Sequence, residues 1–294
     1  MVFITSYFNI SNMPKPIISL ILSVTCLFFV SCVGQQEARS PKGYDFSNPV
    51  KYDMPDDLTE ISGIAFNKGN PDTLFVEQDE DGKLFYFKPG SKDVPAIKFG
   101  KSGDYEDLAI ISNQVVMLRS DGVLFTFPLD VKNAKPAVKE LDSLLPKGEY
   151  EGLFADDASQ LIYALCKRCA MEKSSKTNTI FSFKLSADGA LQSDGKFIID
   201  VKKIEELTGT KKITFHPSAL SKNRQTGEWY ILSSVNKLLV VADPNWVVKA
   251  VYTLNPRTFH QPEGMTFDNS NNLYISNEGD KVQPGNVLKF ELTK

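Results

Sequence analysis

The 294-residue sequence is poor in the residues on which several kinds of site depend: it has two histidines, four cysteines and a formal net charge of only −3. Neither histidine is paired with a convincing serine or cysteine nucleophile, and the Gly-x-Ser-x-Gly motif of serine hydrolases does not occur. Lysine and arginine are spread through the chain instead of clustered. The sequence therefore indicates no surface for nucleic acid or for an anionic membrane.

Sustained helical periodicity is also missing, except for a brief stretch near Val201 to Leu207. Aromatic residues make up 11% of the chain, and glycine, proline, asparagine and aspartate are frequent. This composition fits many short strands joined by tight turns. The sequence therefore indicates an all-β protein.

The apolar run from Ile17 to Val30 is too short for a membrane-spanning helix, which needs about 20 residues. Because Lys15 precedes it and small residues follow it, we interpret residues 1–31 as an export signal. The segment Phe29-Val-Ser-Cys32 resembles a bacterial lipobox with Phe29 in place of the usual leucine, which predicts that Cys32 is lipidated. The alternative is a cleaved secretory peptide.

Residues 32–43 are polar and suit a flexible tether between the lipid and a folded domain of residues 44–294. This organisation predicts a lipoprotein of the bacterial cell envelope, on the periplasmic or surface side. Its contact with the membrane would be through the lipid alone.

One short pattern recurs along the rest of the chain: a strand, a polar turn and a second strand. Its first residues are Ser62, Glu106, Glu151, Ser218 and Glu263. The interval is about 45 residues, which is the period of a β-propeller blade of four strands. The one longer interval, after Glu151, is covered by a polar loop over residues 167–178 and a helical turn over residues 202–211.

These repeats predict a single propeller of five four-stranded blades, with six blades as the alternative. The last repeat has only three clear strands. The segment from Tyr44 to Tyr52, with its alternating Phe46, Val50 and Tyr52, is expected to supply the fourth and close the ring. Closure would remove exposed sheet edges, which promote aggregation.

In a four-stranded meander, the start of the innermost strand and the end of the second strand lie on the same face. The repeats should therefore bring polar side chains together around one mouth of the central channel. The predicted mouth residues are Glu60, Glu77, Arg119, Glu149, His216, His260 and Glu278, together with Glu106, Glu151 and Glu263.

Clustered carboxylates repel one another unless they are protonated, paired or bound to a cation. Oxygen ligands suit Ca²⁺ or Mg²⁺, so Glu106, Glu151 and Glu263 are candidate metal ligands. Two alternatives stay open. Arg119 and Lys167 would neutralise the ring internally, or each glutamate would cap backbone N–H groups of the next blade.

The two histidines occupy equivalent places in their repeats, which favours a structural role, although both are placed at the mouth, where they would also face a ligand. Cys166 and Cys169 are the pair left once Cys26 is assigned to the signal and Cys32 to lipidation. In an oxidising envelope they predict a disulfide. No βαβ pattern surrounds them as in a redox motif, and no further zinc ligands are evident nearby.

Several motifs together resemble the SdiA-regulated family of bacterial envelope β-propellers. They are Leu58-Thr-Glu-Ile-Ser-Gly-Ile, Glu106-Asp-Leu, Glu151-Gly-Leu, Trp229-Tyr-Ile-Leu-Ser-Ser and Gln261-Pro-Glu-Gly-Met. The resemblance implies an exported, often lipid-anchored propeller whose biochemical role is poorly defined. More distantly, the acidic blade starts are similar to those of gluconolactonase-type and phytase-type propellers, which hold divalent cations, but Ser62 and Ser218 depart from that pattern.

Our leading hypothesis is a binding module that presents an acidic, cation-binding channel mouth to a small molecule or a protein. One alternative is a metal-dependent hydrolase of a lactone or phosphoester, with His260 or Glu278 as general base. The other is a scaffold whose channel is only structural. A propeller fold does not by itself specify an activity.

Overall fold

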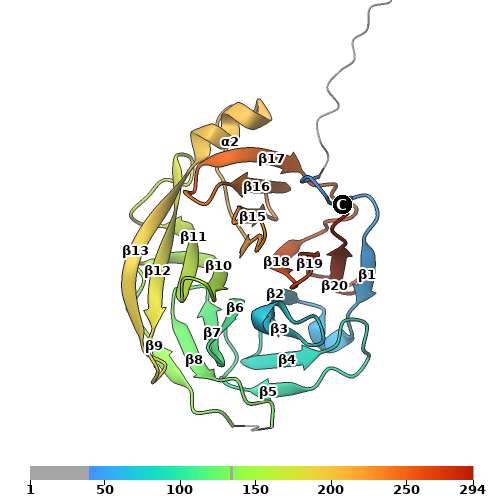
Figure 1. The fold of residues 1–294 in the computed structure, drawn as a ribbon, viewed down its shortest axis with the longest axis vertical. Helices are drawn as coiled ribbons and strands as arrows, with labels where there is room; N and C mark the ends of the chain where they lie inside the picture. The colour runs from blue at the N-terminus through green and yellow to red at the C-terminus, as the bar shows by residue number, and fades with distance from the viewer. Residues whose placement is uncertain (1–39, 133–134, 294) are drawn as a thin grey trace, which may run out of the picture. The chain divides into compact units, whose positions relative to one another are not determined.

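The computed structural model describes residues 40–132 and 135–293, which belong to one compact unit of residues 38–294. The predicted signal peptide, Cys32 and most of the tether lie outside the described residues. Within these, no helix is long and apolar enough to cross a membrane. The described strands form five four-stranded antiparallel sheets around a central axis (Figure 1). The predicted five-bladed propeller is therefore confirmed.

The first four blades are simple meanders whose strands follow chain order from the axis outward (Figure 1). Blade 1 contains β2 (Ile61–Phe66), β3 (Leu74–Gln78), β4 (Lys83–Phe87) and β5 (Ala96–Lys98). Blade 2 contains β6 (Tyr105–Ile111), β7 (Gln114–Arg119), β8 (Leu124–Pro128) and β9 (Lys139–Leu141). Two short 3-10 helices, η3 (Asp56–Leu58) and η4 (Asn67–Gly69), flank β2.

Blade 3 contains β10 (Gly148–Asp156), β11 (Leu161–Cys169), β12 (Thr177–Leu185) and β13 (Leu191–Asp200). Blade 4 contains β14 (Ala219–Lys222), β15 (Trp229–Ser233), β16 (Leu238–Ala242) and β17 (Val248–Thr253). The inner strands β2, β3 and β15 are buried along their whole length because they are covered on both faces by neighbouring blades. Their sequences accordingly show no alternation of apolar and polar residues, and even Ser62, Glu77 and Gln78 within them are buried.

The long interval in blade 3 comes from long strands and from one helix, α2 (Val201–Thr208). The Asp200 side chain caps this helix by accepting a hydrogen bond from the Lys202 N–H, and the helix ends at Gly209, which has a left-handed φ of 68°. The predicted helical turn is confirmed. The predicted loop is shorter than expected, because β11 runs on to Cys169 and β12 starts at Thr177.

Blade 5 is closed by the N-terminal strand, as predicted. It contains β18 (Pro262–Phe267), β19 (Leu273–Asn277), β20 (Asn286–Phe290) and, outermost, β1 (Val50–Asp53). The strand is shorter than the expected segment from Tyr44. Asp45 accepts a hydrogen bond from the Ser47 N–H at 2.9 Å, which turns the chain, and Phe46 instead packs on Phe290 with ring centroids 4.7 Å apart.

Side-chain hydrogen bonds tie the inner strands of neighbouring blades together. The Ser62 hydroxyl donates to the Glu106 carbonyl at 2.9 Å, and the Ser218 hydroxyl donates to the Pro262 carbonyl at 2.8 Å. Asp107 accepts from the Leu153 N–H at 2.6 Å. These contacts explain why Ser62 and Ser218 stand where other blades have glutamate. They also fix the blade starts that surround the channel mouth.

Candidate functional site

The three blade-start glutamates lie close enough to perturb one another. Burial raises the pKa of Glu106 to about 10, and the neighbouring Glu151 adds to this effect. Burial and Glu151 likewise raise the pKa of Glu263 to about 8. The pKa of Glu151 is raised to about 7 by burial, against the opposing effect of Lys167. The structure thus brings the three candidate ligands into one acidic group, in which Glu151 is buried and Glu106 and Glu263 are partly buried.

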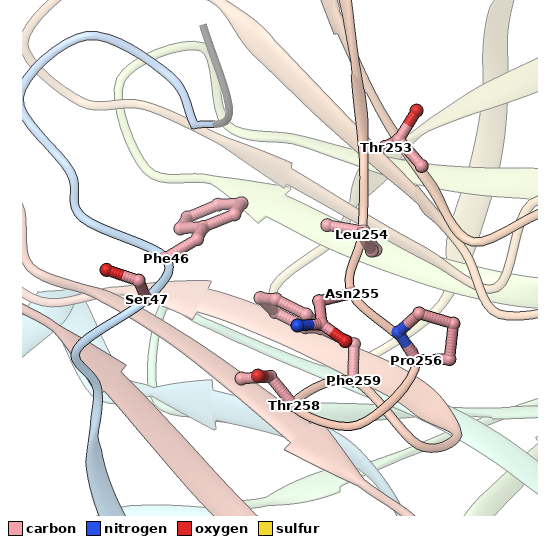
Figure 2. A pocket seen from close by; sticks show the side chains of 8 residues that line it. All are labelled: Phe46, Ser47, Thr253, Leu254, Asn255, Pro256, Thr258 and Phe259. Carbon is pink, nitrogen blue, oxygen red and sulfur yellow. The ribbon is translucent and has the colours of Figure 1, made fainter.

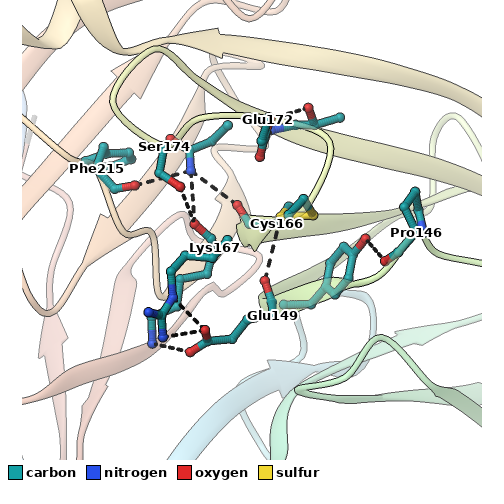
Figure 3. The surroundings of a disulfide bond; sticks show 12 residues. Pro146, Glu149, Cys166, Lys167, Glu172, Ser174 and Phe215 are labelled. Carbon is teal, nitrogen blue, oxygen red and sulfur yellow. Dashed lines mark hydrogen bonds and ion pairs between the residues drawn. A yellow bond between two sulfur atoms is a disulfide. The ribbon is translucent and has the colours of Figure 1, made fainter.

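Lys167 supplies a positive charge inside this group. Its ammonium is hydrogen-bonded to Glu151 and lies 3.4 Å from a Glu149 carboxylate oxygen. Burial alone would lower the pKa of Lys167, but Glu151, Glu149 and Glu106 raise it above its usual value. The neighbouring Arg168 pairs with Glu149 at 2.5 Å, so two cations face the carboxylates at this side of the mouth (Figure 3).

Arg119 does not take part in this neutralisation. It binds Asp121 through two hydrogen bonds of 2.9 Å and approaches Glu140 at 4.0 Å. Asp121 lies only two residues away in the turn after β7 and therefore captures the guanidinium. Of the two cations expected to neutralise the ring, only Lys167 faces it.

A disulfide joins Cys166 and Cys169, as predicted, and brackets the two basic residues between them (Figure 3). Opposite them in the sheet, Gly148 pairs with Cys169 and Tyr150 with Cys166. The bond therefore lies within the end of β11, the stretch that pairs with the start of β10, where Glu149 and Glu151 begin the blade.

A second acidic group, which we call the rim cluster, surrounds Asp79 after the end of β3. Burial raises the pKa of Asp79 to about 7, and four further carboxylates add to the effect: those of Glu60, Glu278, Glu80 and Asp104. Of these, Glu60 and Glu278 were predicted mouth residues. Asp79, Glu80 and Asp104 were not, although the acidic sequence that follows Glu77 at the end of β3 signals Asp79 and Glu80.

Two carboxylate oxygens in this region are buried without a hydrogen-bond partner: Oδ1 of Asp79 and Oε2 of Glu77. Glu77 is fully buried, and its other oxygen accepts a hydrogen bond from the Gly63 N–H at 2.5 Å. Burial holds the pKa of Glu77 well above its usual range, and Asp107 and Asp79 add to the shift. Glu77 thus links the rim cluster to the blade starts.

Within residues 40–132 and 135–293, most of these carboxylates have no basic partner within 4.0 Å. This holds for Glu60, Glu77, Asp79, Glu80, Asp104, Glu106, Glu263 and Glu278. Glu278 accepts a hydrogen bond from the Gln261 amide at 2.7 Å, and Asp104 accepts one from Ser120. The carboxyl groups over blades 5, 1 and 2 therefore lack basic partners, and the raised pKa values of Glu106 and Glu263 mean that these two groups are mostly protonated at neutral pH.

The two histidines lie beside the mouth, held through their backbones. The His216 N–H donates to the Asn236 side chain at 3.0 Å, and the His260 carbonyl accepts from the Lys237 ammonium at 2.5 Å. Burial, with Arg168 and Lys167 nearby, lowers the pKa of His216. Nε2 of His260 lies 3.7 Å from Asp280. Both Nδ1 atoms are buried without a hydrogen-bond partner.

The blade-start glutamates do not fit direct coordination of one cation as they lie. Oxygen ligands about 2.4 Å from a Ca²⁺ ion lie within about 4.8 Å of one another. In the described part of the chain, the only three side chains of metal-binding type that meet this limit are Cys166, Cys169 and Glu172, and the two sulfurs are bonded to each other. Binding of Ca²⁺ or Mg²⁺ stays a prediction that requires the glutamates to move.

A separate hollow of about 490 Å³ lies between the N-terminal segment and the loop after β17 (Figure 2). Its walls include Phe46, Leu254, Pro256 and Phe259. None of the predicted mouth residues lines it, so it belongs to the groove between blades 4 and 5 and not to the acidic mouth.

Comparison with solved structures supports the fold alone. Glutaminyl cyclase of Myxococcus xanthus superposes with a TM-score of 0.56 at 15% identity, covering 83% of this chain and 94% of that one. A luciferin-regenerating enzyme gives a TM-score of 0.51 at 10% identity, covering 83% and 95%. No curated protein matches the sequence significantly. The family model named SdiA-regulated matches residues 50–281, nearly the whole propeller, and the chain therefore belongs to the SdiA-regulated family.

Proposed function

We propose that this protein is a binding module, attached to the cell envelope by a lipid on Cys32, that holds a positively charged group in its acidic mouth. One observation carries the proposal: the rim cluster around Asp79 gathers carboxylates without basic partners in the described structure. Carboxylates that crowd together without basic partners repel one another, which costs free energy, and groups whose pKa values are perturbed in this way concentrate at functional sites. A cationic ligand would relieve this cost.

The geometry favours binding over catalysis. The His216 carbonyl accepts a hydrogen bond from the Ser233 hydroxyl at 2.6 Å, and neither imidazole is hydrogen-bonded to a serine or cysteine side chain in the described residues. No activated nucleophile is formed here. The hydrolase hypothesis needs a metal site that the glutamates do not form as they lie, and no specific observation favours it.

The test is a calorimetric titration of residues 38–294 with Ca²⁺, Mg²⁺ and spermidine, each at pH 6 and pH 8. We expect at least one of them to bind more tightly at pH 8, because Asp79 loses its proton near pH 7. The double variant Asp79→Asn/Glu278→Gln should weaken binding at least tenfold, since losing a charge-assisted hydrogen bond costs roughly 1.5–3 kcal/mol.

The matched control is Asp188→Asn/Asp194→Asn, which removes one carboxylate from the turn between β12 and β13 and one from β13, and should leave affinity unchanged. If none of the three cations binds the unmodified domain, the mouth is a scaffold and the proposal is wrong. A different result would favour the hydrolase hypothesis over the binding module. In that case Ca²⁺ or Mg²⁺ binds the domain, the Glu151→Gln and Glu263→Gln variants no longer bind it, and the metal-loaded domain turns over a lactone or phosphoester.

A further inference from the structure

Three large apolar side chains project into solvent from equivalent turns on the mouth side. Met171, Val235 and Val282 are 54%, 66% and 89% exposed. They lie in the turns between the second and third strands of blades 3, 4 and 5, over residues 170–176, 234–237 and 278–285. Predicted mouth residues lie close by in the sequence: Lys167 is near the end of β11, and Glu278 is the first residue of its turn. We call these three side chains the apolar tips.

A single exposed apolar residue needs no explanation, but three on equivalent turns around one opening form a pattern. The corresponding turns of blades 1 and 2 differ. They carry Asp79, Glu80, Asp81 and Asp121 in their place. The mouth face therefore has an acidic side over blades 5, 1 and 2, whereas the apolar tips stand among charged residues in the turns of blades 3 to 5. The two kinds of side chain meet in the turn of blade 5, which carries Glu278 and Val282.

The spacing of the carboxylates indicates which kind of cation can bind on the acidic side of the mouth. No three of them, in the described residues, have oxygens within 4.8 Å of one another, so no three of these carboxylates can coordinate one metal ion as they lie. A guanidinium is wider and presents five N–H donors in a rigid planar fork, so it can pair with two separated carboxylates at once. Arginine is also enriched at the centres of protein interfaces, where it is surrounded by apolar contacts.

We infer that the mouth face docks a protein segment that inserts one arginine into the rim cluster and lays flanking apolar side chains on Met171, Val235 and Val282. This inference rests on the proposed function and names its ligand. It excludes a polybasic segment, because Lys173, Lys176 and Lys281 in the same turns would repel additional cations. It also excludes an anionic lipid surface, which the carboxylates would repel.

The experiment uses three fluorescently labelled peptides and residues 38–294. The first is Ser-Leu-Arg-Leu-Ser, the second replaces both leucines by glycine, and the third replaces the arginine of the first by neutral citrulline. We expect the leucine peptide to bind at least fivefold more tightly than the glycine peptide, and the citrulline peptide to lose at least tenfold in affinity.

Variants of the protein assign the effect to the two sides of the face. The triple variant Met171→Ser/Val235→Ser/Val282→Ser should bind the leucine peptide only as tightly as the glycine peptide. Its affinity for the glycine peptide should not change. Asp79→Asn/Glu278→Gln should weaken both. The matched control, Val131→Ser/Val247→Ser, removes exposed valines from turns between third and fourth strands and should change neither affinity.

The outcomes separate this inference from the proposed function. Equal affinity for the leucine and glycine peptides overturns the docking inference while the acidic mouth stands as a cation site. Binding of Ca²⁺, Mg²⁺ or spermidine without binding of either arginine peptide does the same. Tighter binding of oligolysine or of vesicles containing anionic lipid also overturns it. Failure of every cation and every peptide overturns both.

Discussion

Replacing Glu263 by glutamine should stabilise the propeller, and the gain should grow with pH. Burial first, and then Glu151 and Glu278, hold the pKa of Glu263 near 8, with a smaller opposing effect of a hydrogen bond from Ser234. In the unfolded chain the carboxyl titrates near 4.5. Between these two values folding takes up a proton, so this group makes the protein less stable as pH rises through that window. Glutamine has nearly the same shape as glutamate but does not ionise, so the variant does not lose stability in this way as the pH rises.

The size of the effect follows from the difference between the two pKa values. Each pKa unit corresponds to about 1.4 kcal/mol, which sets a ceiling of roughly 5 kcal/mol for Glu263→Gln above pH 8. Water entry and movement of the neighbouring carboxylates reduce such penalties, so we expect a gain on the order of 2–3 kcal/mol. Below pH 4.5 the carboxyl is protonated in both states, and the gain should vanish.

The assay is urea unfolding of residues 38–294 and of the variant at pH 4, 6 and 8.5. Glu291→Gln serves as control, because Glu291 is fully exposed and paired with Lys289, which lowers its pKa. That substitution should bring no gain that rises with pH. A Glu263→Gln protein that is less stable than the parent at pH 8.5, or whose gain is equal at pH 4 and pH 8.5, would refute the reasoning.

Two further predictions concern the covalent and the topological closure of the chain. The double variant Cys166→Ser/Cys169→Ser should lose about 2 kcal/mol of unfolding free energy, a small loss because the bond closes a very short loop. Urea unfolding measures this loss, and a variant as stable as the parent would contradict the prediction. Deleting everything before Met54 removes β1 and leaves β20 as an exposed edge, so the shortened protein should aggregate in size-exclusion chromatography. A chain that starts at Pro49 keeps β1 and should stay monomeric; a monomeric chain from Met54 with an unchanged melting temperature would show that closure is dispensable.

The sequence was most informative where side-chain periodicity and turn residues act together. The predicted pattern of a strand, a polar turn and a second strand recurs in every blade, as in β18 and β19 of blade 5. The N-terminal segment was less predictable. Its alternation suited a strand from Tyr44, but the buried hydroxyl of Tyr44 donates to the Asn271 carbonyl at 2.7 Å instead.

The mouth was predictable in outline, since repeats place blade starts on one face. Its charge pairing was not. Arg119 pairs with Tyr105 in its blade as Cys166 pairs with Tyr150, so Arg119 corresponds to Cys166 and not to Lys167. Asp121 binds Arg119 within its own turn, while Glu149 and Glu151 bind Lys167. Asp79 was missed because it lies just past the strand end. Such pairings depend on local turn geometry, which the repeat period does not specify.

The joining of both chain ends in blade 5 has a mechanical consequence. The Thr293 N–H donates to the Gly43 carbonyl at 2.8 Å, so the two ends of the propeller are fastened side by side. In the proposed lipid-anchored protein, tension along the tether would first meet this hydrogen bond and the buried rings of Tyr44 and Phe46. Strand β1 would bear load only after those anchors gave way. In a lipid-anchored protein, these contacts would thus keep tension on the tether from separating β1 from β20.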